Sequence, residues 1–390
     1  MPCYEAPSMR VLLAIHHPLS QDLGAPGVTL ALGRALQAQG CTVDYYGYGD
    51  AFPGEQHHSA LHNLRFPWKL SAHLTRVARK YDVLDVTTGD AWPWARAGRP
   101  GASRRHALVT RSHGLEHTVS EQLRADAREG KAHLSWKYPL YHGGFRLWEV
   151  AQSLRLADRS VLLNEADAAY ARERLHVPAS KLSLIPHGLG EAFHGLSLPA
   201  PLADGPLRLA TVGTFIQRKG REDVIAAVGR LHALGLPFTL TLYGTGTPEP
   251  EVRAAFPSSV QAHLRVVPHY AHATLPGLLA HEEVLLFPSH AEGHGMALVE
   301  AMASGLVPIS TPVGVAPSIV HPGRTGLLVP IGDVDALVEA VRSLAADPSQ
   351  RYALRRAAQA EVQRLTWPDI ASRTRAVYEE VLRIRSASGK

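Results

Sequence analysis

The chain has 390 residues, of which 45% are hydrophobic and 19% charged, and its formal net charge is +5. At about 100–200 residues per domain this length predicts two domains or more, and the hydrophobic content excludes a wholly disordered chain. Two cysteines exclude a disulfide scaffold and fit a reducing cytosol, and the sparse excess of Lys and Arg argues against a dedicated nucleic-acid binder. No apolar run approaches the ~20 residues of a membrane helix, and the N-terminus lacks the core of a signal peptide, so we expect a cytoplasmic protein.

Short apolar runs alternate with amphipathic stretches along the chain, which predicts parallel βαβ units. In the first half we expect a helix over 28–39 and strands over 10–15, 41–46, 83–86, 106–110, 160–163 and 182–185. Residues 189–206 are rich in Gly and Pro without periodicity and predict a linker. Beyond it we expect strands over 207–212, 238–243, 264–267, 284–287 and 307–310, and helices over 221–234, 295–303, 334–345 and 367–385.

We therefore predict an α/β protein with two tandem, Rossmann-like, doubly wound parallel-sheet domains. The predicted boundaries are 1–188 for the first domain, 189–206 for the linker, 207–366 for the second domain and 367–390 for a final helix. In folds of this kind ligands bind beyond the carboxyl ends of the strands, so the cleft between the domains is the expected site.

The most informative motif is FPSHAEGHGMALVEAMASG, residues 287–305. A buried strand ends at Pro288, a glycine-containing loop holds Glu292, and a helix carrying Glu300 follows. Glycines at such a turn let the backbone approach a ligand, and the N–H groups of a new helix suit a phosphate. The two carboxylates can accept hydrogen bonds from hydroxyls on either side of that phosphate. A capped helix with an exposed glutamate is the alternative, and the glycines favour the binding site.

A second motif, VGTFIQRKG, spans residues 212–220. Gly213 follows a predicted strand, and Arg218 and Lys219 place two cations over the loop, which suits a diphosphate. Taken alone, an adjacent Arg-Lys pair is more often solvated surface charge.

Both motifs resemble those of the family-4 retaining glycosyltransferases of the GT-B fold, whose E-x7-E signature reads EGFGLxxLEAMAxGxP. The resemblance implies that Glu292 contacts the donor sugar and that Glu300 binds the ribose hydroxyls. It also implies that backbone amides of His294, Gly295, Met296 and Ala297 bind sugar or phosphate. His294 stands where the family has Phe, and Val307 where it has Pro. The family's VGRLxxxKG segment implies that Arg218 and Lys219 clamp the diphosphate beside Gly213.

Looser matches extend the resemblance over most of the chain. Residues 266–270 take the place of the segment where the nucleotide base packs, which puts His269 in the donor site. Gly24-Ala-Pro-Gly27 corresponds to the glycine loop that faces donor phosphates and acceptor. His113-Gly114 resembles the segment whose histidine reaches the donor sugar, and Ile185-Pro-His187-Gly188 is expected only to form a turn. The final helix resembles one that crosses back to the first domain.

The implied activity is transfer of a hexose from a nucleoside-diphosphate sugar to an acceptor hydroxyl with retention of configuration. The acceptor is a glycan, lipid or small molecule that enters from first-domain loops, including the aromatic-rich residues 136–148. No metal or other cofactor is expected, because the Asp333-Val-Asp335 triplet begins a predicted helix, where Asp is favoured as a cap.

Other classes remain open at this point. A dinucleotide-dependent oxidoreductase is suggested by Gly24, Gly27 and Asp44, although GAPG does not fit G-x-G-x-x-G. The same fold also serves nucleotide-sugar epimerases, phosphorylases and non-catalytic binders; no signature for a pyridoxal-bearing lysine is present. Peripheral membrane contact is suggested by the basic stretch 69–80 and the arginines of 96–105, although the apolar spacing in 69–80 equally fits a helix packed on a sheet.

Overall fold

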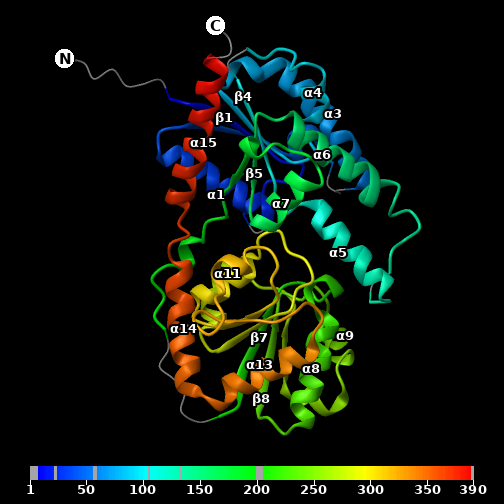
Figure 1. The fold of residues 1–390 in the computed structure, drawn as a ribbon, viewed down its shortest axis with the longest axis vertical. Helices are drawn as coiled ribbons and strands as arrows, with labels where there is room; N and C mark the ends of the chain where they lie inside the picture. Colours follow the sequence, from blue (N-terminus) through cyan, green and yellow to red (C-terminus); the bar gives the residue numbers. More distant parts are fainter. Residues whose placement is uncertain are drawn as a thin grey trace, which may run out of the picture. The chain divides into compact units, whose positions relative to one another are not determined.

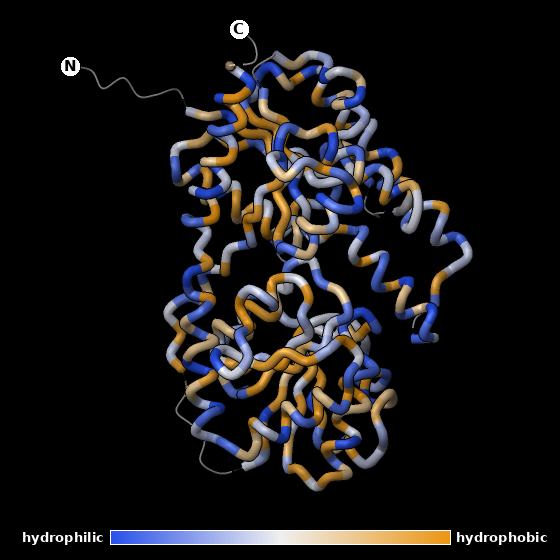
Figure 2. The backbone as a smooth tube through the Cα atoms, in the orientation of Figure 1, coloured by the Kyte–Doolittle hydropathy of each residue, from blue (hydrophilic) through white to orange (hydrophobic). Residues whose placement is uncertain are grey.

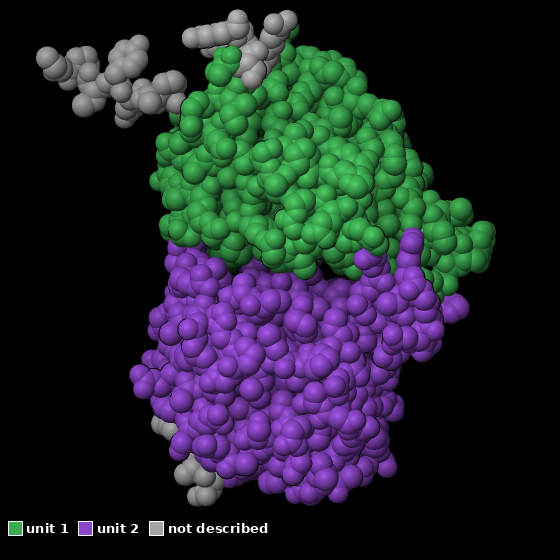
Figure 3. Space-filling model, viewed as in Figure 1, with its two compact units in different colours: residues 1–120, 134–188, 367–390 green, residues 121–133, 189–366 purple. Residues whose placement is uncertain are grey.

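The computed structural model describes residues 8–21, 24–55, 59–103, 106–131, 133–198 and 205–387. The chain divides into two compact units (Figure 3). Unit 1 comprises residues 1–120, 134–188 and 367–390, and unit 2 comprises residues 121–133 and 189–366. Residues 121–133 thus pack with unit 2, whereas the sequence-based boundary placed them in the first domain.

Unit 1 is built on a six-stranded sheet in which every strand pair is parallel. In spatial order its strands are β2 (Thr42–Tyr46), β1 (Arg10–Ala14), β3 (Val83–Thr87), β4 (Ala107–Arg111), β5 (Arg159–Leu162) and β6 (Leu182–Leu184). The chain runs from β1 to one edge and then returns to β3 on the other side of β1. This reversal opens a crevice at the carboxyl ends of β1 and β3, where ligands bind in doubly wound folds.

Helices cover both faces of this sheet (Figure 1). They are α1 (Gly24–Ala38), α2 (Tyr48–Ala51), α3 (Ala60–Val77), α4 (Trp92–Arg96), α6 (Arg146–Leu156), α7 (Glu165–Glu173) and α15 (Trp367–Ala387), while α5 (Glu116–Arg128) begins in unit 1 and ends in unit 2. Val11 and Leu13 of β1 pack towards α1 and α15, whereas Leu12 and Ala14 pack towards α3 and α4. This alternation buries both faces of the sheet.

The final helix is anchored in unit 1 by a buried polar cluster. The Tyr378 hydroxyl donates to Asp85 Oδ2 at 2.5 Å, and the same oxygen accepts from Arg111 Nη2 at 2.6 Å. All three side chains are buried, so each polar group has the partner that burial demands.

Unit 2 repeats the architecture with a second six-stranded parallel sheet. In spatial order its strands are β12 (Leu327–Leu328), β11 (Val307–Ser310), β10 (Val284–Phe287), β7 (Leu207–Val212), β8 (Phe238–Tyr243) and β9 (Leu264–Val267). Its helices are α8 (Arg221–Ala233), α9 (Glu249–Ala254), α10 (Leu275–Leu279), α11 (Met296–Ala303), α12 (Ala316–Ile319), α13 (Val334–Ala346) and α14 (Pro348–Val362). The hydrophobic strands of both sheets contrast with their more polar surroundings in Figure 2.

The predicted α/β fold with two doubly wound parallel sheets is confirmed, and the predicted strands agree with the observed ones to within about a residue at each end. The Gly24–Gly27 segment was predicted as a loop but forms the first turn of α1. In the predicted linker, Leu189 and Phe193 are fully buried in the core of unit 2.

The basic stretch 69–80 lies in α3 and the turn that follows it, and Leu70 and Leu74 are fully buried in the core of unit 1. Packing on the sheet therefore accounts for its apolar face. Arg99 pairs with Asp158 at 2.7 Å, and Arg104 and Arg105 lie outside the described residues. Within the described part of the chain, no helix is both long and apolar enough to span a membrane.

Candidate active site

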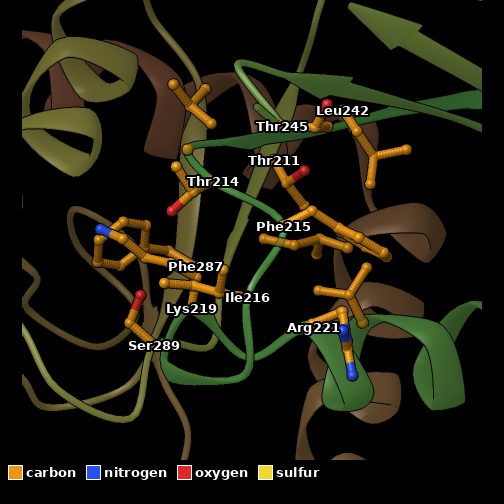
Figure 4. Close-up of a pocket in the computed structure, with 14 residues that line it drawn as sticks. Thr211, Thr214, Phe215, Ile216, Lys219, Arg221, Leu242, Thr245, Phe287 and Ser289 are labelled. Carbon is orange, nitrogen blue, oxygen red and sulfur yellow. The ribbon is translucent and has the colours of Figure 1, made fainter. Parts of the chain in front are cut away.

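The candidate site of unit 2 lies where its strand order reverses. β7 and β10 are neighbours in the sheet, but the chain proceeds from β7 towards β9 and from β10 towards β12, on opposite sides. A pocket opens there, lined by Gly213, Thr214, Lys219 and Ser289 together with apolar side chains of β7, β8 and β10 (Figure 4). Thr214, Lys219 and Ser289 gather on one side of this pocket, and Phe215 and Leu242 lie on the other.

The loop after β7 carries the two cations of the predicted diphosphate clamp. Gln217–Lys219 form a single 3₁₀ turn that ends at Gly220, which adopts a left-handed conformation with φ 76° and caps α8. A Cβ at position 220 would lie 2.2 Å from the Pro288 carbonyl oxygen. Only glycine therefore lets the loops after β7 and β10 approach this closely.

Glu292 lies between the two cations. Lys219 Nζ donates to Glu292 Oε1 at 2.6 Å, and Arg218 Nη1 lies 3.8 Å from Glu292 Oε2. The Ser289 hydroxyl also donates to Oε1, at 2.8 Å. The Glu292 side chain is only 7% exposed, so this charge is held by fixed partners instead of solvent. The structure thus brings together three of the predicted residues, of which Lys219 and Glu292 are 73 positions apart in the chain.

The helix after Glu292 begins as predicted. Gly295 caps α11 with φ 93°, and Met296 and Ala297 form its first turn, where N–H groups have no partner within the helix. His294 is buried, and burial lowers the pKa of its ring to about 3, so the imidazole is neutral. Its carbonyl oxygen accepts from the Val315 N–H at 2.8 Å, which fixes the turn.

Glu300 lies in the second turn of α11 and is buried. His272 Nε2 lies 2.8 Å from Glu300 Oε1. Burial, assisted by the charge of Glu300, raises the pKa of Tyr270 to about 12. The predicted residue His269 is exposed, and it is its neighbours Tyr270 and His272 that surround Glu300.

In unit 1, His113 follows β4 among other histidines. The His187 ring centroid lies 5.5 Å away, and His16, which follows β1, lies 2.8 Å from Asp90 Oδ2 through its Nδ1. Burial, assisted by the charges of Arg111, His16 and His17, lowers the pKa of His113 to about 3. His113 Nδ1 is buried without a hydrogen-bond partner among the described residues, so a neutral ring nitrogen is available there.

The other residues singled out from the sequence are Gly24, Gly27, Asp44 and Asp333, and the donor contacts of Gly24 and Gly27 stay a prediction. A Cβ at Gly27 would lie 2.7 Å from the Gln21 carbonyl oxygen, whereas one at Gly24 would meet nothing within 4 Å. Asp44 accepts from the Tyr81 hydroxyl at 2.9 Å. The Asp333 carboxylate accepts from the Ala336 N–H at 2.9 Å, which confirms the predicted helix cap.

Three residues of the site were not predicted: Ser289, His290 and His272. Tyr270 lies in the predicted segment 266–270, from which only His269 was named as a site residue. Ser289 and His290 lie inside the quoted motif, so their closeness to Glu292 was a usable signal. Nothing in the sequence near His272 indicates that it meets Glu300, because that contact depends on how α11 packs.

Comparison with known proteins identifies the class to which this fold and site belong. Residues 206–347 match the family described as "Glycosyl transferases group 1", and residues 24–191 match "Glycosyltransferase Family 4". The chain is a glycosyltransferase and belongs to the family-4 type with the GT-B fold. The oxidoreductase alternative is not favoured.

Relatives share both the sequence and the fold. The chain is 28% identical over 377 residues to glycogen synthase of Mycobacterium tuberculosis, a match that covers 95% of this chain and 80% of that protein. Sucrose-phosphate synthase of Thermosynechococcus elongatus has a similar structure, with a TM-score of 0.74 at 23% identity, covering 96% of this chain and 100% of that chain. Anabaena HepE, solved in complex with UDP, has a TM-score of 0.68 at 16% identity, covering 95% and 100%.

Proposed function

We propose that this glycosyltransferase takes its sugar from a nucleoside-diphosphate donor held by unit 2 and transfers it with retention of configuration. The observation that carries the proposal is the meeting of Arg218, Lys219 and Glu292 at the reversal of strand order, beside the glycine-capped start of α11. Two cations and a helix N-terminus suit a diphosphate.

The donor contacts both α11 and the loop after β7. Its diphosphate lies over Gly213, Lys219 and the amides of Gly295, Met296 and Ala297, and its ribose hydroxyls donate to Glu300. Glu292 accepts from the sugar. Arg218 and Lys219, in place of a divalent cation, neutralise the charge that develops on the departing nucleotide.

The binding of a diphosphate requires an exchange of partners. In the structure Lys219 is paired with Glu292. A phosphate oxygen replaces that carboxylate as the partner of Lys219, which frees an oxygen of Glu292 for a sugar hydroxyl. Lys219 therefore binds the diphosphate of the donor and Glu292 binds its sugar. No residue forms a covalent bond to the sugar.

Unit 1 supplies the acceptor side. His113, after β4, has a buried Nδ1 without a hydrogen-bond partner among the described residues, and Oε2 of Glu116, the first residue of α5, is likewise buried without one. These atoms can accept hydrogen bonds from acceptor hydroxyls. Trp136 of the aromatic-rich stretch is 77% exposed, which leaves it accessible to an acceptor, whereas Trp148 stacks on Phe145 and is 39% exposed.

The experiment that tests this function has two parts. A thermal-shift series with UDP, GDP, ADP and dTDP and their sugars identifies the donor by the nucleotide that raises the melting temperature most. Proton NMR of the product then gives the anomeric configuration. Stabilisation by one nucleotide and an unchanged anomer support the proposal, whereas no stabilisation by any nucleotide refutes the donor class and an inverted anomer refutes retention.

Glu300→Gln is expected to weaken nucleotide binding about 10- to 100-fold, because a charged acceptor of two ribose hydroxyls is replaced by a neutral one. Turnover at saturating donor should change little. Isothermal titration calorimetry with the nucleotide found in the screen measures the effect. Glu282→Gln is the matched control, since Glu282 is also buried but accepts from the Tyr243 hydroxyl at 2.8 Å. An equal loss in both variants, or none in Glu300→Gln, contradicts the ribose role.

A further inference from the structure

His290, two residues before Glu292, is held between two carboxylates. Its side chain is 1% exposed. Nδ1 lies 3.0 Å from Asp126 Oδ2 on α5, and Nε2 lies 2.7 Å from Asp223 Oδ2 on α8. Both carboxylates are buried. All three residues belong to unit 2.

This geometry requires a charged ring. An ionised carboxylate only accepts hydrogen bonds, so both contacts are satisfied at once only when each ring nitrogen carries a proton. The hydrogen bond to Asp223 has the largest influence and raises the pKa of His290 above 6.5; Asp126 also raises it, and burial opposes both. The two hydrogen bonds therefore favour the imidazolium form of the ring.

The backbone of His290 is joined to the diphosphate clamp. Its N–H donates to the Arg218 carbonyl oxygen at 2.8 Å, and Arg218 Nη1 donates to the Ala291 carbonyl oxygen at 2.8 Å. The loop that carries Glu292 and the segment that carries Lys219 are thus connected in both directions, and the His290 side chain ties this pair of loops to α5 and α8.

We propose that His290 is a positioning residue for sugar transfer, which holds the Glu292 loop and the Arg218-Lys219 segment in place only while its imidazole binds both Asp126 and Asp223. This inference rests on the proposed function for its effect on turnover. A neutral ring has a single N–H and can donate to one carboxylate only. The other carboxylate would then be buried without its partner, which is costly and loosens the loop.

The remaining charged groups around the triad do not replace the imidazolium. The hydrogen bond with Glu129, assisted by the charges of Asp223 and Asp126, raises the pKa of Lys131, but the Lys131 side chain is 43% exposed and pairs with Glu129 at 2.7 Å. Gln122 Nε2 donates to the other oxygen of Asp126 at 2.8 Å and carries no charge. On the site side, Arg218 lies 3.8 Å from Glu292, so these two charges are paired with each other.

The direction of the pH effect follows from the raised pKa. Because the folded pKa of His290 is above 6.5, the contribution of the triad is fully present below pH 6.5 and is lost as pH rises through the folded value. We therefore expect kcat/KM to fall on the alkaline side with the titration of this ring.

Asp126→Asn tests the proposal most sharply. Asparagine keeps the size and one acceptor oxygen but removes a charge beside the ring, so the pKa of His290 should fall by about 1 unit or more. The pH profiles of kcat/KM for the wild type and for Asp126→Asn are each scaled to their own maximum. The alkaline limb of the variant should lie at lower pH by the same amount. Glu339→Gln is the control, because it removes an exposed carboxylate of unit 2 that pairs with Arg342 at 2.7 Å and not with His290, and it should leave the limb in place.

Two readouts do not need turnover. NMR titration follows the His290 ring, assigned by its loss in His290→Gln, and hydrogen exchange of residues 289–297, corrected for intrinsic rates, reports whether the loop loosens above the ring pKa. In the wild type, the ring titration, the rise in loop exchange and the alkaline fall of kcat/KM should occur at the same pH. That agreement supports the proposal even if Asp126→Asn fails to fold. A ring that titrates at or below pH 6.5, or a loop whose exchange ignores that titration, overturns it. Absence of sugar transfer with both readouts as expected counts against the proposed function alone.

Discussion

Lys219→Ala is expected to lower kcat about 10²- to 10³-fold, the size of loss seen when one preorganised charge-stabilising group is removed from an active site. Lys219 Nζ is 2.6 Å from Glu292 and lines the pocket at the reversal of strand order. Its charge is the one best placed to stabilise a departing diphosphate. Steady-state kinetics with the donor identified by thermal shift measures the loss.

Arg230→Ala is the control for a general loss of positive charge. Arg230 is half exposed on α8 and pairs with Asp335, away from the pocket lining. It should retain wild-type turnover. If Lys219→Ala turns over like the wild type, or if both variants lose activity equally, the clamp assignment is wrong.

Gly220→Ala is expected to destabilise unit 2 and to impair donor binding, because the added methyl group causes both backbone strain and a steric clash. The left-handed φ of 76° costs an L-residue about 1–2 kcal/mol. The new Cβ would also lie 2.2 Å from the Pro288 carbonyl oxygen, which forces the loops after β7 and β10 apart at a further ~1–3 kcal/mol.

Gly235→Ala separates the two costs. Gly235 has φ 70°, yet a Cβ there would meet nothing within 4 Å. It therefore bears the backbone cost alone and should leave nucleotide affinity unchanged. Urea unfolding and calorimetry on both variants give the comparison; equal destabilisation in the two would show that the approach of the two loops is not tight.

Strands and the donor motifs were predictable because their signals are local. A parallel strand buried on both faces is a continuous apolar run, as in Val284–Phe287, where no residue is more than 3% exposed. The loop after β7 and the turn before α11 each present their functional residues within one short segment. The glycines that shape them are visible in the sequence as well.

Helix α14 was not predicted, because two arginines interrupt the apolar residues of its buried side. Arg351 and Arg355 are 8% and 2% exposed and donate to the carbonyl oxygens of Leu344 and Gly305, each at 2.6 Å. Leu354, Ala358 and Val362 are buried on the same side, so the apolar stripe of this helix is short and broken by charge. Helix α5 is similarly polar, and Asp126 in its second half meets His290, which lies 164 positions further along the chain.

The contacts between residues of the site could not be predicted from the sequence, because the residues that meet are far apart in the chain. His290 and Asp126 are 164 positions apart, and Lys219 and Glu292 are 73 apart. Such residues meet only when the chain is packed, since they lie on or after different strands and helices. The donor contact of His269 stays a prediction, and the turn after β9 presents its neighbours Tyr270 and His272 to Glu300.

We place the nucleoside diphosphate of the donor at the carboxyl ends of β7 and β10, where the strand order of unit 2 reverses. Hydrogen-exchange mass spectrometry of the wild-type chain, with and without the nucleotide that stabilises it most, tests this directly. We expect bound nucleotide to slow exchange in residues 213–220 and 289–300. Unchanged exchange in both segments, with protection appearing around Gly24 and Gly27 of unit 1 instead, would contradict it.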